Sequence, residues 1–269
     1  MICPNCGANI AEGSKFCTEC GTQLPTVPAV KKELKYELIG DTVPCVEIML
    51  DNGDSVYTQR GGMIWQTEGI NMVTNTKGGV MKGLGRMLAG ESLFMATYSS
   101  TMNGAKVAFG STVPGSIMPL NLTGTPGIIA QKHAFLCAQN GVNVDIALTK
   151  KFSAGLFGGE GFILENIHGD GYVFLEVDGD KVVRELAPGE VIKVDTGNVV
   201  AFDKTVSYEI ETVKGVSNIL FGGEGLFLTR LTGPGKVILQ TQNFLDFASR
   251  VIGMMPSSSG GNSVIGMFT

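Results

Sequence analysis

Two Cys-x-x-Cys pairs near the N-terminus constrain this chain more than any other feature of its sequence. The four cysteines are Cys3, Cys6, Cys17 and Cys20. A glycine follows each pair at the same offset, at Gly7 and Gly21, where a tight turn needs a positive φ. The residues between the pairs suffice for a short hairpin that gathers four thiolates around one ion. This donor set suits Zn²⁺ in tetrahedral geometry.

A closed set of four thiolates leaves no open coordination position, so the predicted zinc ion is structural, with one ion per chain. A redox pair or disulfides are the alternatives, but a redox Cys-x-x-Cys usually occurs once, at the start of a helix. The other two cysteines, Cys45 and Cys137, lie in apolar runs, which favours a reducing cytoplasm. The stretch resembles the short zinc ribbons at the N-termini of many bacterial proteins, which implies a docking or assembly module.

The composition indicates that the main domain is all-β. Of 269 residues, 38 are glycine and 17% are charged, which favours tightly turned strands over helices. No stretch of about 18 uncharged apolar residues occurs, so no transmembrane helix is predicted. We expect a zinc ribbon over residues 1–24, a linker over 25–35, a β domain with a terminal helix over 36–252, and a flexible tail over 253–269.

Three internal repeats are predicted within the β domain. Phe-Gly-Gly-Glu-Gly occurs at residues 157–161 and 221–225, and Leu-Ala-Gly-Glu-Ser at 88–92 is a looser copy. Their glutamates are Glu91, Glu160 and Glu224. A second element, a glycine before a strand-like run, recurs at Gly53, Gly115 and Gly189. Repeats too small to bury their own faces should pack together, so we expect a hairpin-rich, pseudo-threefold β-prism or sandwich.

Two local signals refine this fold. Asp178-Gly179 lies between two apolar runs and predicts a two-residue hairpin. Residues 242–251 predict a terminal helix with Phe244, Phe247 and Val251 on one face.

The three glutamates have two interpretations. Pseudo-symmetry would bring them to one axis, where a ring of carboxylates could bind a hard cation. Alternatively, each caps a glycine turn or pairs with the lysine that precedes it in its repeat, and we favour this second interpretation. No catalytic site is predicted, because His133 and His168 are far apart, Cys137 has apolar neighbours, and no Gly-x-Ser-x-Gly elbow occurs.

Residues 79–94, with the two Phe-Gly-Gly-Glu-Gly copies, resemble the altered inheritance of mitochondria protein 24 family and its bacterial relatives. The resemblance covers nearly everything after the linker. It implies a β fold similar to the tryptophan RNA-binding attenuation protein, with no established catalytic residues. Mitochondrial members are linked to inner-membrane organisation. This chain adds the ribbon and shows no mitochondrial targeting segment, so we expect that role not to transfer.

We therefore expect a non-enzymatic scaffold or interaction protein whose zinc module docks a protein partner that the sequence does not name. The alternative is a small-ligand- or RNA-binding regulator, by analogy of fold with the attenuation protein. A formal net charge of −5 disfavours nucleic acid, because phosphate contacts need a basic surface. We also expect homo-oligomers, since β repeats leave strand edges that need cover.

Residues 77–90 predict a short basic amphipathic helix in the first repeat. Its apolar stripe includes Leu84 and Met87, and Lys82 and Arg86 lie off that stripe. Two internal glycines cost about 1 kcal/mol each relative to alanine, so the helix is marginal alone. One interpretation is that it folds back over its own β domain. The other is that these four residues contact a protein partner or a membrane surface.

Co-sedimentation with anionic liposomes tests the membrane interpretation. If it holds, wild-type protein pellets with the liposomes at low salt, and Lys82→Glu/Arg86→Glu protein does not, because the charge reversal removes the attraction to anionic lipid. Wild-type protein that stays in the supernatant together with the variant contradicts a membrane contact.

Overall fold

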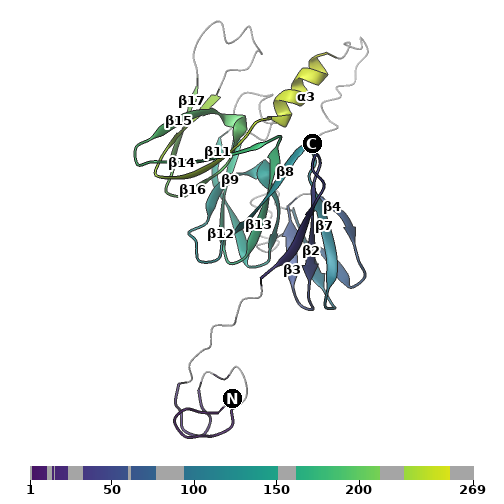
Figure 1. Ribbon diagram of the computed structural model, residues 1–269, viewed down its shortest axis with the longest axis vertical. Helices are drawn as coiled ribbons and strands as arrows, with labels where there is room; N and C mark the ends of the chain where they lie inside the picture. Colours follow the sequence, from purple (N-terminus) through teal and green to yellow (C-terminus); the bar gives the residue numbers. More distant parts are fainter. Residues whose placement is uncertain are drawn as a thin grey trace. The chain divides into compact units, whose positions relative to one another are not determined.

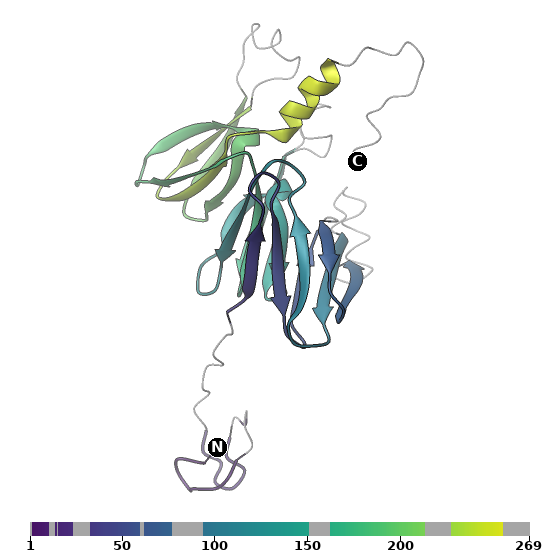
Figure 2. The same ribbon diagram turned by 45° about the vertical axis from the view of Figure 1, so that its right-hand side comes forward.

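The chain divides into two compact units, Met1–Glu33 and Leu34–Thr269. The computed structural model describes residues 2–10, 14, 16–23, 33–59, 62–76, 94–150, 162–212 and 227–254. The first unit contains the two cysteine pairs, and the second is the β domain (Figures 1 and 2).

The described part of the β domain contains four antiparallel sheets, numbered I to IV here (Figure 1). Sheet I has the strand order β1 (Lys35–Ile39), β2 (Cys45–Leu50), β7 (Ala105–Gly110), β4 (Met63–Gln66). Sheet II has the order β5 (Ile70–Thr76), β6 (Phe94–Ser100), β3 (Ser55–Thr58), β10 (Phe135–Gln139), β13 (Tyr172–Asp178), β8 (Gly115–Asn121).

Sheet III has the order β11 (Val142–Lys150), β12 (Phe162–Gly169), β9 (Ile128–Gln131), β16 (Val199–Asp203), β19 (Gly235–Gln240), β14 (Lys181–Leu186). Sheet IV has the order β15 (Val191–Asp195), β18 (Phe227–Thr232), β17 (Ser207–Thr212). Short 3₁₀ turns, η1 (Lys132–Ala134) and η3 (Thr196–Asn198), precede β10 and β16. The prediction of an all-β main domain is confirmed.

The four sheets stack in their numbered order, because three apolar clusters lie between successive sheets. Successive side chains of a strand point to opposite faces. In β13, Val173 and Leu175 belong to the cluster between sheets II and III, whereas Phe174 belongs to the cluster between sheets I and II. In β16, Phe202 joins the cluster between sheets III and IV. The central strands β10 and β13 of sheet II and β16 of sheet III are therefore buried on both faces, which explains their nearly continuous apolar sequences.

The same strand pairings recur in three successive segments, residues 45–110, 115–178 and 181–240. In each segment the first strand pairs with the sixth, the second with the fifth, the third with the sixth and the fourth with the fifth. This recurrence agrees with a repeated unit. A pseudo-threefold axis that relates the three units stays a prediction.

The hairpin predicted at Asp178-Gly179 is wrong. The turn exists, and Gly179 has φ +67°, but β13 and β14 belong to different sheets. β10 and β8 already occupy both edges of β13. The chain therefore crosses to sheet III, where β14 pairs with β19.

The second recurring element is wrong in its middle copy. Gly53 and Gly189 precede β3 and β15, which are the second strands of their segments. Gly115 instead begins β8, the first strand of its segment. A glycine before an apolar run marks a turn and does not identify which strand follows.

The terminal helix is α3, Phe244–Gly253. The Asp178 carboxylate accepts a hydrogen bond from the backbone amide of Phe244 at 3.1 Å, where the helix begins. The three residues expected on one apolar face, Phe244, Phe247 and Val251, are all exposed.

Tyr57 provides a test of the contact between sheets II and III. Its buried hydroxyl donates a hydrogen bond to the carbonyl oxygen of Val142 in β11, at 3.0 Å. Tyr57→Phe should lower the free energy of unfolding by about 1 kcal/mol, because a buried carbonyl loses this donor. Urea unfolding measures the change. The matched control is Tyr208→Phe, since the half-buried Tyr208 ring packs on Phe202 in sheet III. Equal unfolding midpoints for Tyr57→Phe and wild type would contradict the expectation.

Candidate metal centre

Each cysteine pair lies in a knuckle, a tight turn closed by two backbone hydrogen bonds. In the first knuckle the amide of Cys3 donates to the carbonyl of Ala8 at 2.9 Å, and the amide of Gly7 donates to the carbonyl of Cys3 at 3.0 Å. The second knuckle repeats both bonds, each at 2.9 Å, with Cys17, Thr22 and Gly21. Both glycines have the positive φ predicted from the sequence, 72° and 70°. The knuckles are therefore two copies of one local structure.

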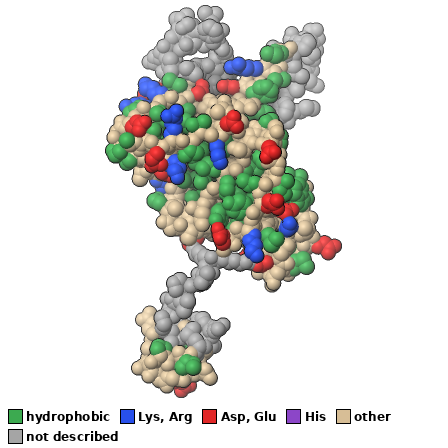
Figure 3. All heavy atoms as spheres, viewed as in Figure 1, with side chains coloured by type: hydrophobic (Ala, Val, Ile, Leu, Met, Phe, Trp, Pro, Cys, Tyr) green, Lys and Arg blue, Asp and Glu red, His purple; other side chains and the backbone are tan. Residues whose placement is uncertain are grey.

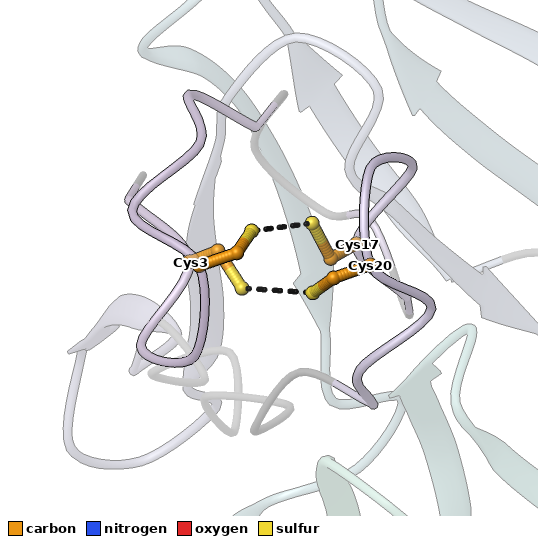
Figure 4. Close-up of side chains that lie close together, drawn as sticks. Cys3, Cys17 and Cys20 are labelled. Carbon is orange, nitrogen blue, oxygen red and sulfur yellow. Dashed lines mark hydrogen bonds between the residues drawn. The ribbon is translucent and has the colours of Figure 1, made fainter.

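The four cysteine sulfurs form one cluster. All four Sγ atoms lie within 4.8 Å of one another. Cys3 Sγ lies 3.7 Å from Cys20 Sγ, and Cys6 Sγ lies 3.6 Å from Cys17 Sγ. Figure 4 shows the sulfurs of Cys17 and Cys20 directed at the knuckle that carries Cys3. A tetrahedral ion with bonds of about 2.3 Å to sulfur requires sulfurs about 3.8 Å apart, so the cluster fits such an ion.

These distances also exclude disulfides within the cluster, because a disulfide bond is about 2.05 Å long. None of the six cysteines forms a disulfide bond. Within the described residues, the four ribbon cysteines are the group of metal-ligating side chains that lies close enough to bind one ion. Cys3 and Cys17 are buried, whereas Cys6 and Cys20 are exposed. The arrangement can hold a metal ion in a closed thiolate site.

Two polar side chains support the exposed Cys20. Thr22 Oγ1 lies 3.1 Å from Cys20 Sγ, and this contact, with the Thr22 backbone amide, lowers the pKa of the Cys20 thiol to about 6. The Asn5 amide nitrogen donates to Thr22 Oγ1 at 2.9 Å and lies 3.8 Å from Cys20 Sγ. The thiolate is the form of cysteine that binds metal, and hydrogen-bond donors beside Cys20 Sγ favour that form. Asn5 therefore links the first knuckle to a ligand of the second.

Asn5 and Thr22 were not predicted from the sequence as part of the site. The available signal was their place beside the ligands, since Asn5 lies inside the first pair and Thr22 lies two residues after Cys20. Polar side chains are common in turns, so position alone does not reveal a hydrogen bond across two knuckles.

The other predicted site residues lie outside the described residues. These are Lys82, Leu84, Arg86 and Met87 of the proposed contact segment, and the repeat glutamates Glu91, Glu160 and Glu224.

The side chains considered for catalysis, His133, His168 and Cys137, all belong to the described residues. Cys137 is fully buried, and burial raises the pKa of its thiol well above its ordinary value. His168 Nε2 lies 2.9 Å from Asp145 Oδ2, and both side chains are accessible to solvent. His133 lies in the η1 turn.

Among the described residues, no helix is both long enough and apolar enough to cross a membrane.

Comparisons with known proteins match both units. A family model described as Mitochondrial biogenesis AIM24 matches residues 36–242, and a zinc-ribbon domain model matches residues 2–24. An uncharacterized protein of Streptococcus pyogenes serotype M6 is 30% identical over 226 residues, which are 80% of this chain and 88% of that protein. A structural-genomics crystal structure of a Streptococcus pyogenes protein is similar with a TM-score of 0.68 and 26% identity, and covers 83% of this chain and 100% of that one.

Thr22→Val tests the support given to Cys20. The substitution keeps the side-chain shape and removes the hydroxyl, so metal affinity should fall roughly 10-fold to 100-fold, as is typical when a partner of a metal ligand is lost. Competition with a chromophoric chelator measures the affinity. The control is Thr18→Val in the same knuckle, because Thr18 is exposed. Equal chelator curves for Thr22→Val and Thr18→Val would contradict the assignment.

Proposed function

The chain belongs to the family described as Mitochondrial biogenesis AIM24, and from that premise we propose a non-enzymatic scaffold or interaction protein whose zinc ribbon docks a protein partner. The ion proposed is one structural Zn²⁺ per chain, held by the four ribbon cysteines. Zinc is the metal that best fits four thiolates in a tetrahedron. A closed thiolate set positions no substrate, so the ion contributes stability to the ribbon. The cytoplasm is the compartment proposed, because the thiolates must stay reduced.

Exposed apolar side chains on the ribbon carry this proposal. Ile2 and Phe16 have exposed fractions of 69% and 56%. Each immediately precedes the first cysteine of its knuckle and forms the matching bridge, Ile2 with Asn9 and Phe16 with Gln23. Two large apolar side chains at equivalent positions of so small a module suit a hydrophobic contact with another protein. The metal fixes the knuckles and thereby the backbone that presents both side chains.

The ribbon also has the independence that a docking module needs. It forms a compact unit distinct from the β domain. Its buried apolar cluster is small, comprising Cys3, Ile10 and Cys17 with Ala8 packed against it. So small a core cannot hold a fold alone, and metal binding supplies the missing free energy.

The alternative of an RNA-binding regulator has less support. On the face shown in Figure 3, Lys and Arg side chains are interspersed with Asp and Glu over the β domain. Binding to nucleic acid needs a basic surface that neutralises phosphates, and the chain carries a formal net charge of −5.

The test separates the contact surface from the metal site. Ile2→Ser/Phe16→Ser protein should keep one zinc per chain and lose partners captured by tagged wild-type protein from the native host. Cys3→Ser/Cys6→Ser protein should lose both the zinc and the partners, while the thermal midpoint of the β domain stays unchanged, because the ribbon folds as a separate unit.

Elemental analysis, affinity capture and differential scanning calorimetry provide the three measurements. The control is Cys45→Ala, which removes a buried cysteine outside the ribbon and should leave zinc and partners in place. Wild-type protein without zinc, or an Ile2→Ser/Phe16→Ser variant with an unchanged set of partners, would overturn the proposal.

A further inference from the structure

Two junctions between strands join the three segments of the β domain. β3 of the first segment pairs with β10 of the second, and β9 of the second pairs with β16 of the third. Both junctions are antiparallel, and both join the second strand of one segment to the third strand of the next. Pairing between the second strand of one segment and the third strand of the next therefore occurs twice within one chain.

A shared irregularity identifies β4 as the counterpart of β10 and β16. Each of these third strands pairs with the sixth strand of its own segment, and each pairing is interrupted by a bulge after one residue. The bulge falls between Met63 and Trp65, between Phe135 and Cys137, and between Val199 and Ala201. Because a bulge fixes register, Ile64 corresponds to Leu136 and Val200, and Gln66 corresponds to Ala138 and Phe202.

The remaining second and third strands, β15 and β4, have no junction partner among the described residues. Sheets II and III each contain six strands, three from one segment and three from the next. In sheet II, the first segment contributes its fourth, fifth and second strands, and the second segment contributes its third, sixth and first strands. Sheet IV contains the fourth, fifth and second strands of the third segment and ends at β15. Sheet I contains the third, sixth and first strands of the first segment, ends at β4, and carries β1 beside β2. Sheet IV and the strands β4, β7 and β2 of sheet I thus correspond to the two halves from which sheets II and III are each built.

Burial supports this reading of β4. Ile64 and Trp65 have exposed fractions of 53% and 39%. Their counterparts in β10 and β16 are buried, with exposed fractions of 5% for Leu136 and 0% for Cys137, Val200 and Ala201. Those four side chains pack against the preceding sheet in the stack. Ile64 and Trp65 have the same place in sheet I, which has no preceding sheet.

We propose that β15 of one copy of this chain pairs antiparallel with β4 of a second copy, which joins sheets IV and I into one seven-stranded sheet that includes β1. A second copy is the partner because its β4 can pair with β15 in the register and antiparallel direction of the two observed junctions, β3 with β10 and β9 with β16. Closure within one chain would have to join the first and last layers of the stack, which sheets II and III separate. The contact is head-to-tail, so it generates a ring or a filament.

The filled junctions also give the register of this contact. Ala138 lies opposite Tyr57, and Phe202 lies opposite Ile129. Gln66 is the counterpart of Ala138 and Phe202. Within the segments, Lys193 pairs with Arg230, Tyr57 with Thr97, and Ile129 with Asn166. Arg230, Thr97 and Asn166 each lie six residues after the repeat glutamate of their segment. Lys193 is therefore the counterpart of Tyr57 and Ile129. Gln66 of one copy should therefore lie opposite Lys193 of the next.

The ribbon takes no part in this contact, so the inference goes beyond the proposed function and stands without it. It also names the homo-oligomer interface that the sequence analysis left open.

Mixed disulfide cross-linking tests the register. Purified, zinc-loaded Gln66→Cys and Lys193→Cys proteins are mixed and oxidised, and a disulfide-linked dimer should form in the mixture and in neither protein alone. Residues opposite each other on paired strands can bridge, whereas diagonal neighbours are about 7–8 Å apart. Gln66→Cys mixed with Val191→Cys, shifted by two residues, is therefore the control and should cross-link at least tenfold less.

Mass measurement tests the association itself. Wild-type protein at micromolar concentrations should show a multiple of the 28.4 kDa chain mass by light scattering. Ile64→Lys should shift it to the monomer mass, because a charge replaces an apolar side chain at the contact. Val43→Lys is the matched control, with an exposed fraction of 54% in the turn before β2, and should keep the wild-type mass.

Three results would overturn the proposal. These are wild-type protein at the monomer mass, equal cross-linking in the matched and shifted mixtures, or Ile64→Lys protein that is folded by circular dichroism and keeps the wild-type mass. A Gln66→Cys/Lys193→Cys double variant that forms a disulfide within a single chain would also overturn it, because the junction would then close inside one molecule.

Discussion

Burial of the central strands of sheets II and III on both faces is the constraint on which the β domain depends. A strand with two buried faces cannot alternate apolar and polar residues, so β10 and β13 are apolar along most of their length. Each of these sheets also needs a further layer on both sides, which no single segment provides. The three apolar clusters between the layers draw residues from neighbouring segments. A segment therefore gains its stability from its neighbours, and the low charge content of the chain follows from this layering.

The ribbon was predictable from the sequence because its constraints are local. Metal ligands spaced as Cys3 and Cys6 fix one knuckle, and the glycine that follows fixes the turn. The second pair repeats both features, so chemistry and backbone agree within a few residues. The hydrogen bond from Asn5 to Thr22 was not predictable in the same way, since it joins the two knuckles. Contacts between knuckles depend on the folded arrangement, which spacing does not encode.

In the β domain, the sequence indicated the strands but not their partners. The turn chemistry of Asp178-Gly179 requires a positive φ, and the structure has it. That requirement says nothing about which edge the next strand meets. Because β10 and β8, which precede β13 in the chain, occupy both of its edges, β14 pairs with β19 instead. Each repeat glutamate lies six residues before a paired residue in β6, β12 or β18, but its position in the sequence does not identify the strand that pairs with that residue.

The side chains of β4 are hard to reconcile with a strand that faces water. Natural edge strands usually carry charges or proline that discourage pairing. β14, an edge of the complete sheet III, carries Lys181, Arg184 and Glu185. β4 reads Met-Ile-Trp-Gln, without a charge, and shares its bulge with two strands whose equivalent residues are buried. The Trp65 indole donates a hydrogen bond to Glu47 at 3.0 Å, so its ring is held at the edge. β4 is thus an edge strand with uncharged, largely apolar side chains and a bulge that fixes its register, as expected of a strand that pairs with another strand.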